Sequence, residues 1–256
     1  MSAPRHLLIV NPNTSTAVSE LLQRHAQAAA GPELVVRTVT ARFGAPYIAC
    51  EASYAVAGHA LLDAWSAALL DGGPTPQAVL IGCFGDPALQ ALRESSPVPV
   101  CGLAQASFAQ AARLGRFVVV TGGVRWAPML QRLADALGVG PALAGIHTVA
   151  PSGAQLAADP VAAAALLAQA CQDAVRQTGA QAVILGGAGL AGLAARIAPA
   201  LEGPGIDSVE AGVAEVLAAL QTAPQRPDRA PGFDVRWQHL SPEMTWLGQQ
   251  DGARPN

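Results

Sequence analysis

The 256-residue chain contains no lysine, and only 13% of its residues are charged and 4% aromatic. All 15 basic residues are arginines spread along the chain, and the formal net charge is −3, so the composition shows no basic surface for a nucleic acid. No apolar run approaches the ~18 residues that a membrane span needs. The apolar run near the N-terminus has only four residues, too few for a secretory signal. We therefore expect a cytoplasmic protein with no nucleic-acid or membrane partner.

Cysteine is scarce, and its spacing excludes the common cysteine-based sites. The four cysteines, at positions 50, 83, 101 and 171, form no C-x-x-C pair and no zinc-finger pattern with the dispersed histidines. In a reducing compartment they are expected to be free thiols. Cys101 and Cys171 lie within apolar segments and are predicted to be packing residues, whereas the role of Cys50 stays open.

Apolar residues make up 51% of the chain, and they fall into alternating strand-like and helix-like segments. This alternation is typical of parallel α/β sheets with helices on both faces. Residues 6–10 predict the first strand, and the polar turn after it precedes a helix with Asn13 or Thr14 as its expected N-cap. Further predictions are a strand at 33–39, a helix at 52–70, a strand before Cys83, and a helix with Asp86 as N-cap and Pro87 as first helical residue.

The second half of the chain repeats the plan of the first. Residues 77–89, QAVLIGCFGDPAL, align without a gap on residues 181–193, QAVILGGAGLAGL, and this alignment places Cys83 opposite Gly187. Residues 116–123 repeat the first strand and its turn. Helices are predicted from 126 to 138 and from Asp159 and Pro160 onward, and Asp207 with Glu210 fits a capping box for the last one.

The repeat predicts an α/β fold of two lobes related by a pseudo-twofold axis, each a parallel sheet with flanking helices. The active site is expected in the cleft between the lobes. We expect residues 1–100 together with 207–222 to form the first lobe, and residues 101–206 to form the second.

The last part of the chain, residues 223–256, is rich in proline and polar residues. Such a composition predicts a tail with little regular structure. Trp237 and Trp246 suggest that parts of this tail dock on a lobe or on a neighbouring subunit, and we expect a homo-oligomer.

Parallel sheets bind ligands beyond the carboxyl ends of their strands. This rule places four turns around one cleft: NPNTS at 11–15, GCFGDP at 82–87, TGG at 121–123 and GGAG at 186–189. Cys83 lies in one of these turns, just before a predicted helix N-terminus, whose N–H groups and dipole would lower the pKa of the thiol. We therefore favour a functional thiol over a buried packing cysteine at this position.

Five motifs carry a family resemblance: IVNPNTS, GCFGDPAL, VVVTGG, VILGGAGLAGL and IDSVEAGV. From about residue 6 to residue 220, the chain resembles the aspartate/glutamate/hydantoin racemase superfamily, and within it the hydantoin and allantoin racemase branch. The resemblance implies an enzyme without a cofactor, in which two cysteines face a substrate stereocentre from opposite lobes. One removes a proton beside a carbonyl, and the other returns one. Carried over to this sequence, Cys83 is one of these groups, but Gly187 occupies the position of the other and cannot hold a proton.

The same motif matches indicate which residues would bind the substrate. Neutral donors at helix starts suit the oxygen of a developing enolate. The alternative is that asparagine and glycine occur there only because turns favour them. Arg125 is a candidate partner for a substrate carboxylate, or else a solvated arginine. The expected substrate-binding residues are Asn11, Asn13, Thr14, Phe84, Gly85, Thr121, Gly122, Gly123, Gly186, Ala188 and Gly189.

The favoured function is a cofactor-independent racemase or epimerase of an amino acid or a hydantoin- or allantoin-like compound, with Cys83 as acid/base group. One alternative is a single-cysteine decarboxylase or isomerase that protonates from one side, as arylmalonate decarboxylase does with a cysteine on the opposite lobe. Another is a ligand-binding relative without catalysis. Residues 187–192, GAGLAG, match a dinucleotide-binding pattern, but no further strands follow to complete such a fold, so we expect no nucleotide cofactor and no metal.

Overall fold

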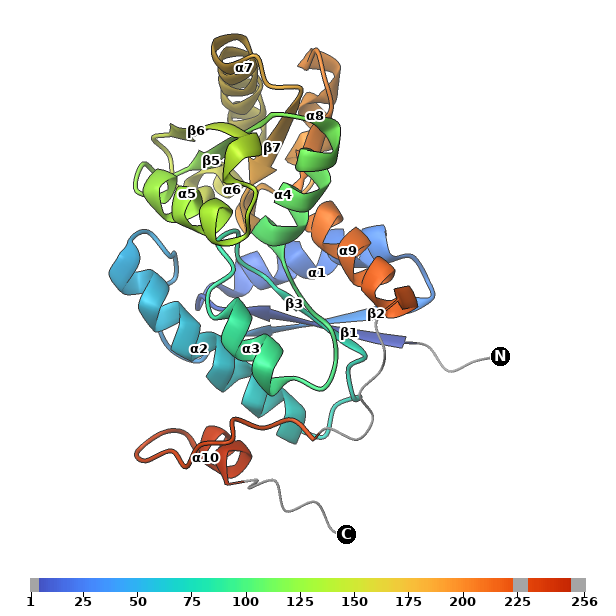
Figure 1. The fold of residues 1–256 in the computed structure, drawn as a ribbon, viewed down its shortest axis with the longest axis vertical. Helices are drawn as coiled ribbons and strands as arrows, with labels where there is room; N and C mark the ends of the chain where they lie inside the picture. Colours follow the sequence, from blue (N-terminus) through green and yellow to red (C-terminus); the bar gives the residue numbers. More distant parts are fainter. Residues whose placement is uncertain (1–4, 223–229, 250–256) are drawn as a thin grey trace.

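Two four-stranded parallel sheets organise the chain into two lobes, one above the other in Figure 1. The structure is a computed structural model that describes residues 5–222 and 230–249. Helices flank both sheets, which confirms the predicted α/β class and its two-lobed plan.

The first lobe alternates strands and helices as the sequence predicts. Its sheet has the order β2-β1-β3-β4, and all neighbouring strands are parallel. The elements are β1 (Arg5–Asn11), α1 (Thr16–Ala30), β2 (Leu34–Thr40), α2 (Glu51–Leu70), β3 (Ala78–Ile81), α3 (Leu89–Ser95) and β4 (Val100–Gly102).

The second lobe repeats this order, as β6-β5-β7-β8, again with parallel neighbours. Every residue of β3 and of β5 is buried, because helices cover both faces of each sheet. From Leu103 onward the elements, in chain order, are α4 (Leu103–Leu114), β5 (Phe117–Gly122), α5 (Trp126–Ala136), η1 (Gly140–Ala142), β6 (Leu143–Val149), α6 (Gly153–Ala158), α7 (Pro160–Thr178), β7 (Ala182–Gly186), η2 (Ala188–Leu190), α8 (Leu193–Ile197), η3 (Ala198–Ala200), β8 (Gly205–Asp207) and α9 (Ser208–Thr222).

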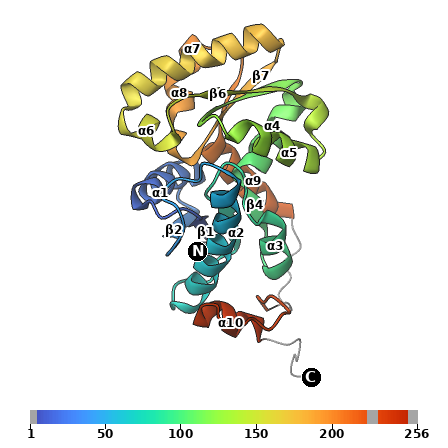
Figure 2. The ribbon, with the colours of Figure 1, turned by 90° about the vertical axis from the view of Figure 1, so that its left-hand side faces the viewer.

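Helices α4 and α9 join the two lobes. Helix α4 follows β4 of the first sheet and also packs on β7 of the second. Helix α9 follows β8 and packs against α1, α4 and β3, so the chain returns from the second lobe to the first (Figure 2). These two helices fix how the carboxyl ends of the strands face one another.

Two predicted helix starts are wrong, and both lie near the cleft. The N-cap of α1 is Ser15, whose Oγ accepts a hydrogen bond from the N–H of Val18 at 3.4 Å, whereas the side chain of Asn13 is used in the preceding turn. Helix α3 begins at Leu89 instead of Pro87. Asp86 and Ala88 adopt positive φ angles of 50° and 56°, so the turn after Cys83 extends further than the sequence suggested.

Two other predicted caps are confirmed. Asp159 caps α7 and accepts a hydrogen bond from the N–H of Ala162 at 3.1 Å, with Pro160 as first helical residue. Asp207 accepts from the N–H groups of Val209 at 2.8 Å and Glu210 at 3.3 Å, which caps α9.

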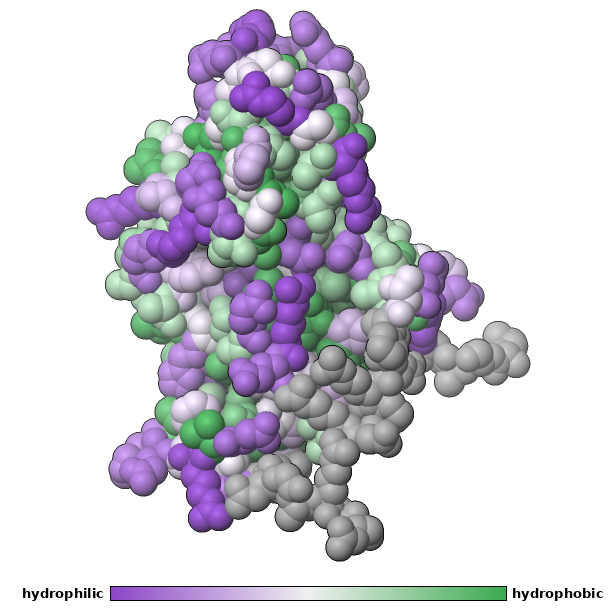
Figure 3. Space-filling view, in the orientation of Figure 1, coloured by the Kyte–Doolittle hydropathy of each residue, from purple (hydrophilic) through white to green (hydrophobic). Residues whose placement is uncertain are grey.

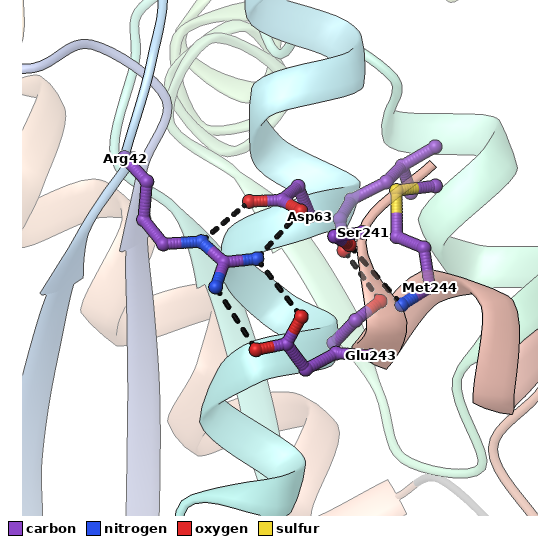
Figure 4. A network of polar contacts seen from close by, with 7 residues as sticks. Arg42, Asp63, Ser241, Glu243 and Met244 are labelled. Atoms are coloured by element: carbon purple, nitrogen blue, oxygen red, sulfur yellow. Dashed lines mark hydrogen bonds and ion pairs between the residues drawn. The ribbon is translucent and has the colours of Figure 1, made fainter. Parts of the chain in front are cut away.

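The described part of the C-terminal segment docks on the first lobe. Residues 230–249 contain a short helix, α10 (Pro242–Gly248), which packs on α2, so this part is more regular than predicted. Arg42 links Asp63 of α2 to Glu243 of α10 (Figure 4). Phe233 contacts Trp65 of α2 edge to face, with ring centroids 5.8 Å apart, and Trp237 contacts Phe233 within the segment, whereas Trp246 is 48% exposed. The rest of the predicted tail, 223–229 and 250–256, lies outside the described residues.

The surface carries interspersed polar and apolar residues. On the face seen in Figure 3, hydrophilic residues cover much of the molecule, with smaller apolar areas between them. Within residues 5–222 and 230–249, no helix combines the length and the apolar character that crossing a membrane requires.

Candidate active site

The carboxyl ends of the central strands meet between the lobes and enclose a cavity. Cys83 reaches it from the turn after β3, and Gly187 reaches it from the turn after β7. The lobes therefore present the two repeat-related positions to one space. The lining residues are Asn13, Val18, Tyr47, Ile48, Gly82, Cys83, Phe84, Thr121, Gly122, Trp126, Gly186, Gly187, Ala188, Gly189 and Leu190.

Cys83 is held in a tight turn at the floor of this cavity. Its carbonyl oxygen accepts hydrogen bonds from the N–H groups of Gly85 and Asp86, at 3.0 and 3.2 Å. The side chain is only 6% exposed. Burial, with a further contribution from the negative charge of Asp86, raises the pKa of the Cys83 thiol. The expected lowering by a helix N-terminus is wrong, because α3 begins only at Leu89.

Asp86 caps a different helix from the one predicted. Its carboxylate accepts hydrogen bonds from the N–H groups of Ala104 at 3.0 Å and Gln105 at 2.7 Å, in the first turn of α4. Burial raises the pKa of Asp86 to about 7, although these hydrogen bonds act in the opposite direction. The residue therefore ties the Cys83 turn to the helix that joins the lobes.

Gly187 lies at the end of β7 with a backbone suited to glycine. Its φ angle is 154°, and its N–H donates to Oγ of Ser208 at 3.3 Å. A Cβ atom at this position would lie 3.2 Å from Cγ of Leu190, closer than most such contacts. Any side chain here requires Leu190 to shift and the backbone to adjust.

Seven of the predicted substrate-binding residues line the cavity. Asn13 and Thr121 supply polar side chains, while Phe84 supplies an aromatic wall. The ring of Phe84 occupies the space that a Cβ atom at Gly186 would need, so this glycine lets the first lobe pack closely on the second. The seven are Asn13, Phe84, Thr121, Gly122, Gly186, Ala188 and Gly189.

The other four predicted residues stand behind the lining. The amide nitrogen of Asn11 donates to Oδ1 of Asn13 at 3.0 Å and to Oγ of Ser19 at 3.0 Å, so Asn11 holds the turn together. The N–H of Thr14 donates to a carbonyl in the loop after β2 at 3.1 Å. Gly85 and Gly123 shape the turns of the two lobes, on either side of the Trp126 ring.

Tyr47, which no pattern in the sequence marked, lines the cavity from the loop at 41–50. Its hydroxyl donates to the carbonyl oxygen of Gly122 in the second lobe, at 3.0 Å. The signal in the sequence was weak: a tyrosine in a long connection after a strand, in a chain with only two tyrosines. Val18, Ile48, Trp126 and Leu190 were also missed, because apolar lining residues look like core residues in a sequence.

The described residues of the cavity wall offer no ionised partner for a charged substrate. Among the described residues, no arginine, aspartate, glutamate or histidine lines it, and Arg125 lies outside it. Nor does that part of the chain bring three potential metal-ligating side chains together. Cys50 caps α2, where a backbone hydrogen bond from Ser53 lowers its pKa, and it does not reach the cavity.

The sequence and the fold are both similar to those of known racemases. Residues 7–216 match the family described as Asp/Glu/Hydantoin racemase. A hydantoin racemase from Paenarthrobacter aurescens is 32% identical over 221 residues, which cover 84% of this chain and 91% of the relative. The allantoin racemase from Klebsiella pneumoniae has a similar structure, with a TM-score of 0.85 and 28% identity over 96% of this chain and 99% of the other.

A more distant structure shares the fold. Arylmalonate decarboxylase aligns with a TM-score of 0.58 and 17% identity, over 86% of this chain and 94% of the other. The extent of the family match, together with the hydantoin racemase relative, decides the assignment. The chain belongs to the Asp/Glu/hydantoin racemase family.

Proposed function

We propose that the protein is a cofactor-independent racemase of a neutral, hydantoin-like cyclic substrate, with Cys83 as an acid/base group. The observation that carries this proposal is a thiol in a cavity whose wall has no ionised side chain among the described residues. A neutral ring fits such a wall, whereas a free amino acid would bury its carboxylate there with neutral donors but without an ionised partner. The similarity to hydantoin and allantoin racemases supports the same substrate class.

The environment of Cys83 suits a substrate with a weakly held proton. Because the pKa of the thiol is raised, only a small fraction is thiolate near neutral pH. That thiolate is a strong base once formed, and a ring carbon beside an uncharged carbonyl gives up its proton more readily than the α-carbon of an amino acid, which lies beside a carboxylate. The thiol then holds the proton within the cavity, ready to return it.

Neutral donors are available for the enolate oxygen. The N–H groups of Ala188 and Gly189 begin the short helix η2, where first-turn N–H groups lack partners within the helix. The amide oxygen of Asn13 accepts hydrogen bonds within its own turn, which leaves its NH₂ group to donate to a ligand. With the hydroxyl of Thr121, these groups would stabilise negative charge without a cation.

A single-cysteine decarboxylase is the second candidate. In its favour, burial raises the pKa of Cys83, which favours the protonated thiol, and the thiol shares the cavity with Gly187, an arrangement that suits protonation of an enolate from one side. Against it stands the wall without ionised groups, since a malonate carries two carboxylates.

The test is proton NMR in heavy water with single enantiomers of allantoin and 5-substituted hydantoins, combined with polarimetry, and with aspartate and glutamate as comparison substrates. We expect C–H exchange with loss of rotation for the ring compounds only. Cys83→Ser should lose nearly all turnover, while Cys101→Ser, at a buried position outside the cavity, should keep it. If the wild type racemises none of these compounds but releases CO₂ from an arylmalonate and forms a single enantiomer, the protein is the decarboxylase of the second candidate instead of a racemase.

A further inference from the structure

Tyr47 reaches from the first lobe into the second at the edge of the cavity. It lies in the loop between β2 and α2, it is half-buried, and it lines the same space as Cys83. Its hydroxyl donates to the carbonyl oxygen of Gly122, the last residue of β5, at 3.0 Å. A side chain of one lobe thus places a protic group on the other.

Backbone hydrogen bonds show on which side of β5 this hydroxyl lies. The N–H of Gly123 donates to the carbonyl of Val149 in β6, at 2.9 Å. The peptide between Gly122 and Gly123 is trans, so the carbonyl of Gly122 points the other way, toward β7. The hydroxyl of Tyr47 therefore sits on the β7 side of the strand end.

The strand register places Gly187 on that same side. In the β5–β7 pair, Thr121 stands beside Gly186, so the next residues in line are Gly122 and Gly187. Neighbouring strands lie about 4.8 Å apart. The phenol oxygen, hydrogen-bonded to Gly122, therefore lies at the end of β5 next to β7, 2.7 Å from where a Cβ atom at Gly123 would lie.

This placement follows from the way the ladder ends. The pairing of β5 with β7 stops at Gly186, and the N–H of Gly187 donates to Ser208 instead. The carbonyl of Gly122 needs another donor, because a buried backbone carbonyl is rarely left unpaired. The hydroxyl of Tyr47 supplies that donor.

We propose that Tyr47 is the acid/base residue opposite Cys83, in the role that Gly187 cannot fill. This inference rests on the proposed racemase function. Among the described lining residues, the protic side chains are those of Cys83, Tyr47, Thr121, Asn13 and Trp126, and only thiols and phenols are groups whose ordinary pKa is about 10 or lower.

The reaction then balances with two groups. The thiolate of Cys83 takes the proton from the ring carbon, and the electron pair moves to the carbonyl oxygen as an enolate. The phenol of Tyr47 gives its proton to the opposite face of that carbon, and the enolate electrons return to form the new C–H bond. Cys83 is left as thiol and Tyr47 as phenolate, the form that converts the other enantiomer in reverse.

The test compares Tyr47→Phe with Tyr54→Phe, in wild-type background. Tyr54 is a matched control, because its hydroxyl also donates to a backbone carbonyl, that of Gly85 at 2.7 Å, but does not line the cavity. Each enantiomer of a hydantoin that the wild type racemises is followed by C–H exchange in heavy water and by optical rotation. The ratio of the exchange rate to the inversion rate is the decisive measurement, because loss of a purely structural contact of Tyr47 would leave this ratio unchanged.

We expect Tyr47→Phe to lower inversion by about 100-fold or more, the usual contribution of an acid/base group. One enantiomer should still exchange its proton through Cys83 with its rotation preserved, whereas Tyr54→Phe should change exchange and inversion in proportion. Inversion by Tyr47→Phe within about threefold of wild type, well below that contribution, would overturn the proposal. So would an equal loss of exchange and inversion for both enantiomers. A wild type without exchange on any hydantoin would instead refute the racemase function itself, before any variant is made.

Discussion

The carboxyl group of Asp86 fills the space that a side chain at Gly102 would need, and a Cβ atom built there would overlap with it. From that position the carboxylate caps α4 through Ala104 and Gln105. In the second lobe, the residue that precedes the corresponding helix is Asp207, which caps α9 from its own start. The two lobes therefore place a carboxylate at equivalent helix starts from different positions in the repeat.

Gly102→Ala should damage both the fold and the site. The added methyl group displaces the carboxyl of Asp86, which removes the cap from α4 and disturbs the turn that holds Cys83. We expect a loss of about 1–3 kcal/mol in unfolding free energy, the usual range for a lost cap with overpacking, and a fall in turnover. Urea unfolding followed by circular dichroism measures the first, and the racemase assay the second.

Gly58→Ala is the matched control for that substitution. Gly58 lies within α2, and a Cβ atom there would meet only ordinary contacts, the nearest 3.5 Å away on Ala88. Alanine favours helix over glycine, so this variant should be as stable as wild type or more so. A Gly102→Ala variant with an unchanged urea midpoint would show that Asp86 can move without cost.

Asp86→Asn should change how stability depends on pH. The pKa of Asp86 is raised by burial to about 7, against about 3.9 in an unfolded chain. Between these values the unfolded chain has lost a proton that the folded protein keeps, so this group lowers the unfolding free energy as pH rises from about 4 to about 7. Asparagine does not titrate. The stability of the variant relative to wild type should therefore rise across that window, by up to about 1.4 kcal/mol for each pH unit.

The reactivity of the Cys83 thiol provides a second measurement of the effect of Asp86→Asn. Because the charge of Asp86 helps to raise the pKa of Cys83, its removal should shift the pH dependence of Cys83 alkylation downward. Iodoacetamide labelling at a series of pH values, with peptide mapping to separate the four cysteines, measures this shift. A stability difference that is constant with pH, together with an unmoved alkylation profile, would contradict the assignment of Asp86 as a buried titrating group.

The sequence predicted those features that depend on local patterns. Apolar runs of four residues followed by glycine marked β3 and β7, because a strand covered on both faces is apolar throughout. The gapless repeat then predicted two lobes and the opposition of Cys83 and Gly187 across a cleft, since similar segments fold alike. Asp159 was recognised as a cap because it directly precedes, in the chain, the helix that it caps.

Features that depend on distant partners could not be predicted in this way. Asp86 followed by proline has the pattern of a local cap, but its carboxylate bonds to a helix that begins at Leu103. Asn13 was a good cap candidate by residue type, yet its oxygen serves the turn and Ser15 caps α1. Tyr47 is recognised as a cavity residue only from the structure, where its hydroxyl contacts Gly122, a residue 75 positions away in the chain. Tertiary contacts decided each case.

Gly187→Cys should place a second thiol in the cavity of Cys83 at a cost in stability. The positive φ angle and the approach to Leu190 at 3.2 Å make a side chain unfavourable, by about 1–3 kcal/mol. In a Tyr47→Phe background, we expect this substitution to recover inversion of a hydantoin, whereas Gly187→Ala adds the same strain without a thiol and should not. Equal recovery by cysteine and alanine would mean that the added side chain acts through shape alone. Polarimetry and heavy-water exchange together distinguish these results.

The Arg42 bridge should fix the C-terminal helix to the first lobe. Its guanidinium group donates to both oxygens of Asp63, at 2.9 and 2.7 Å, and to Glu243 at 2.9 Å (Figure 4). The side chain of Asp63 is only 2% exposed, whereas that of Glu243 is 26% exposed. Asp63→Asn should therefore lower the unfolding free energy by about 1–3 kcal/mol, and Glu243→Gln by less than about 1 kcal/mol.

The pH dependence of this bridge has the opposite sign to that of Asp86. Burial acts to raise the pKa of Asp63, but hydrogen bonds from Arg42 and Ser241 outweigh it, so the net shift is downward. A lowered pKa contributes stability that is present above the unfolded value of about 3.9 and is lost as pH falls below it. The destabilisation by Asp63→Asn should hence be full at pH 7 and shrink in acid, as urea midpoints at several pH values would reveal. An Asp63→Asn variant that loses as much stability in acid as at neutral pH would show that the residue acts by packing on α10 and not through its charge.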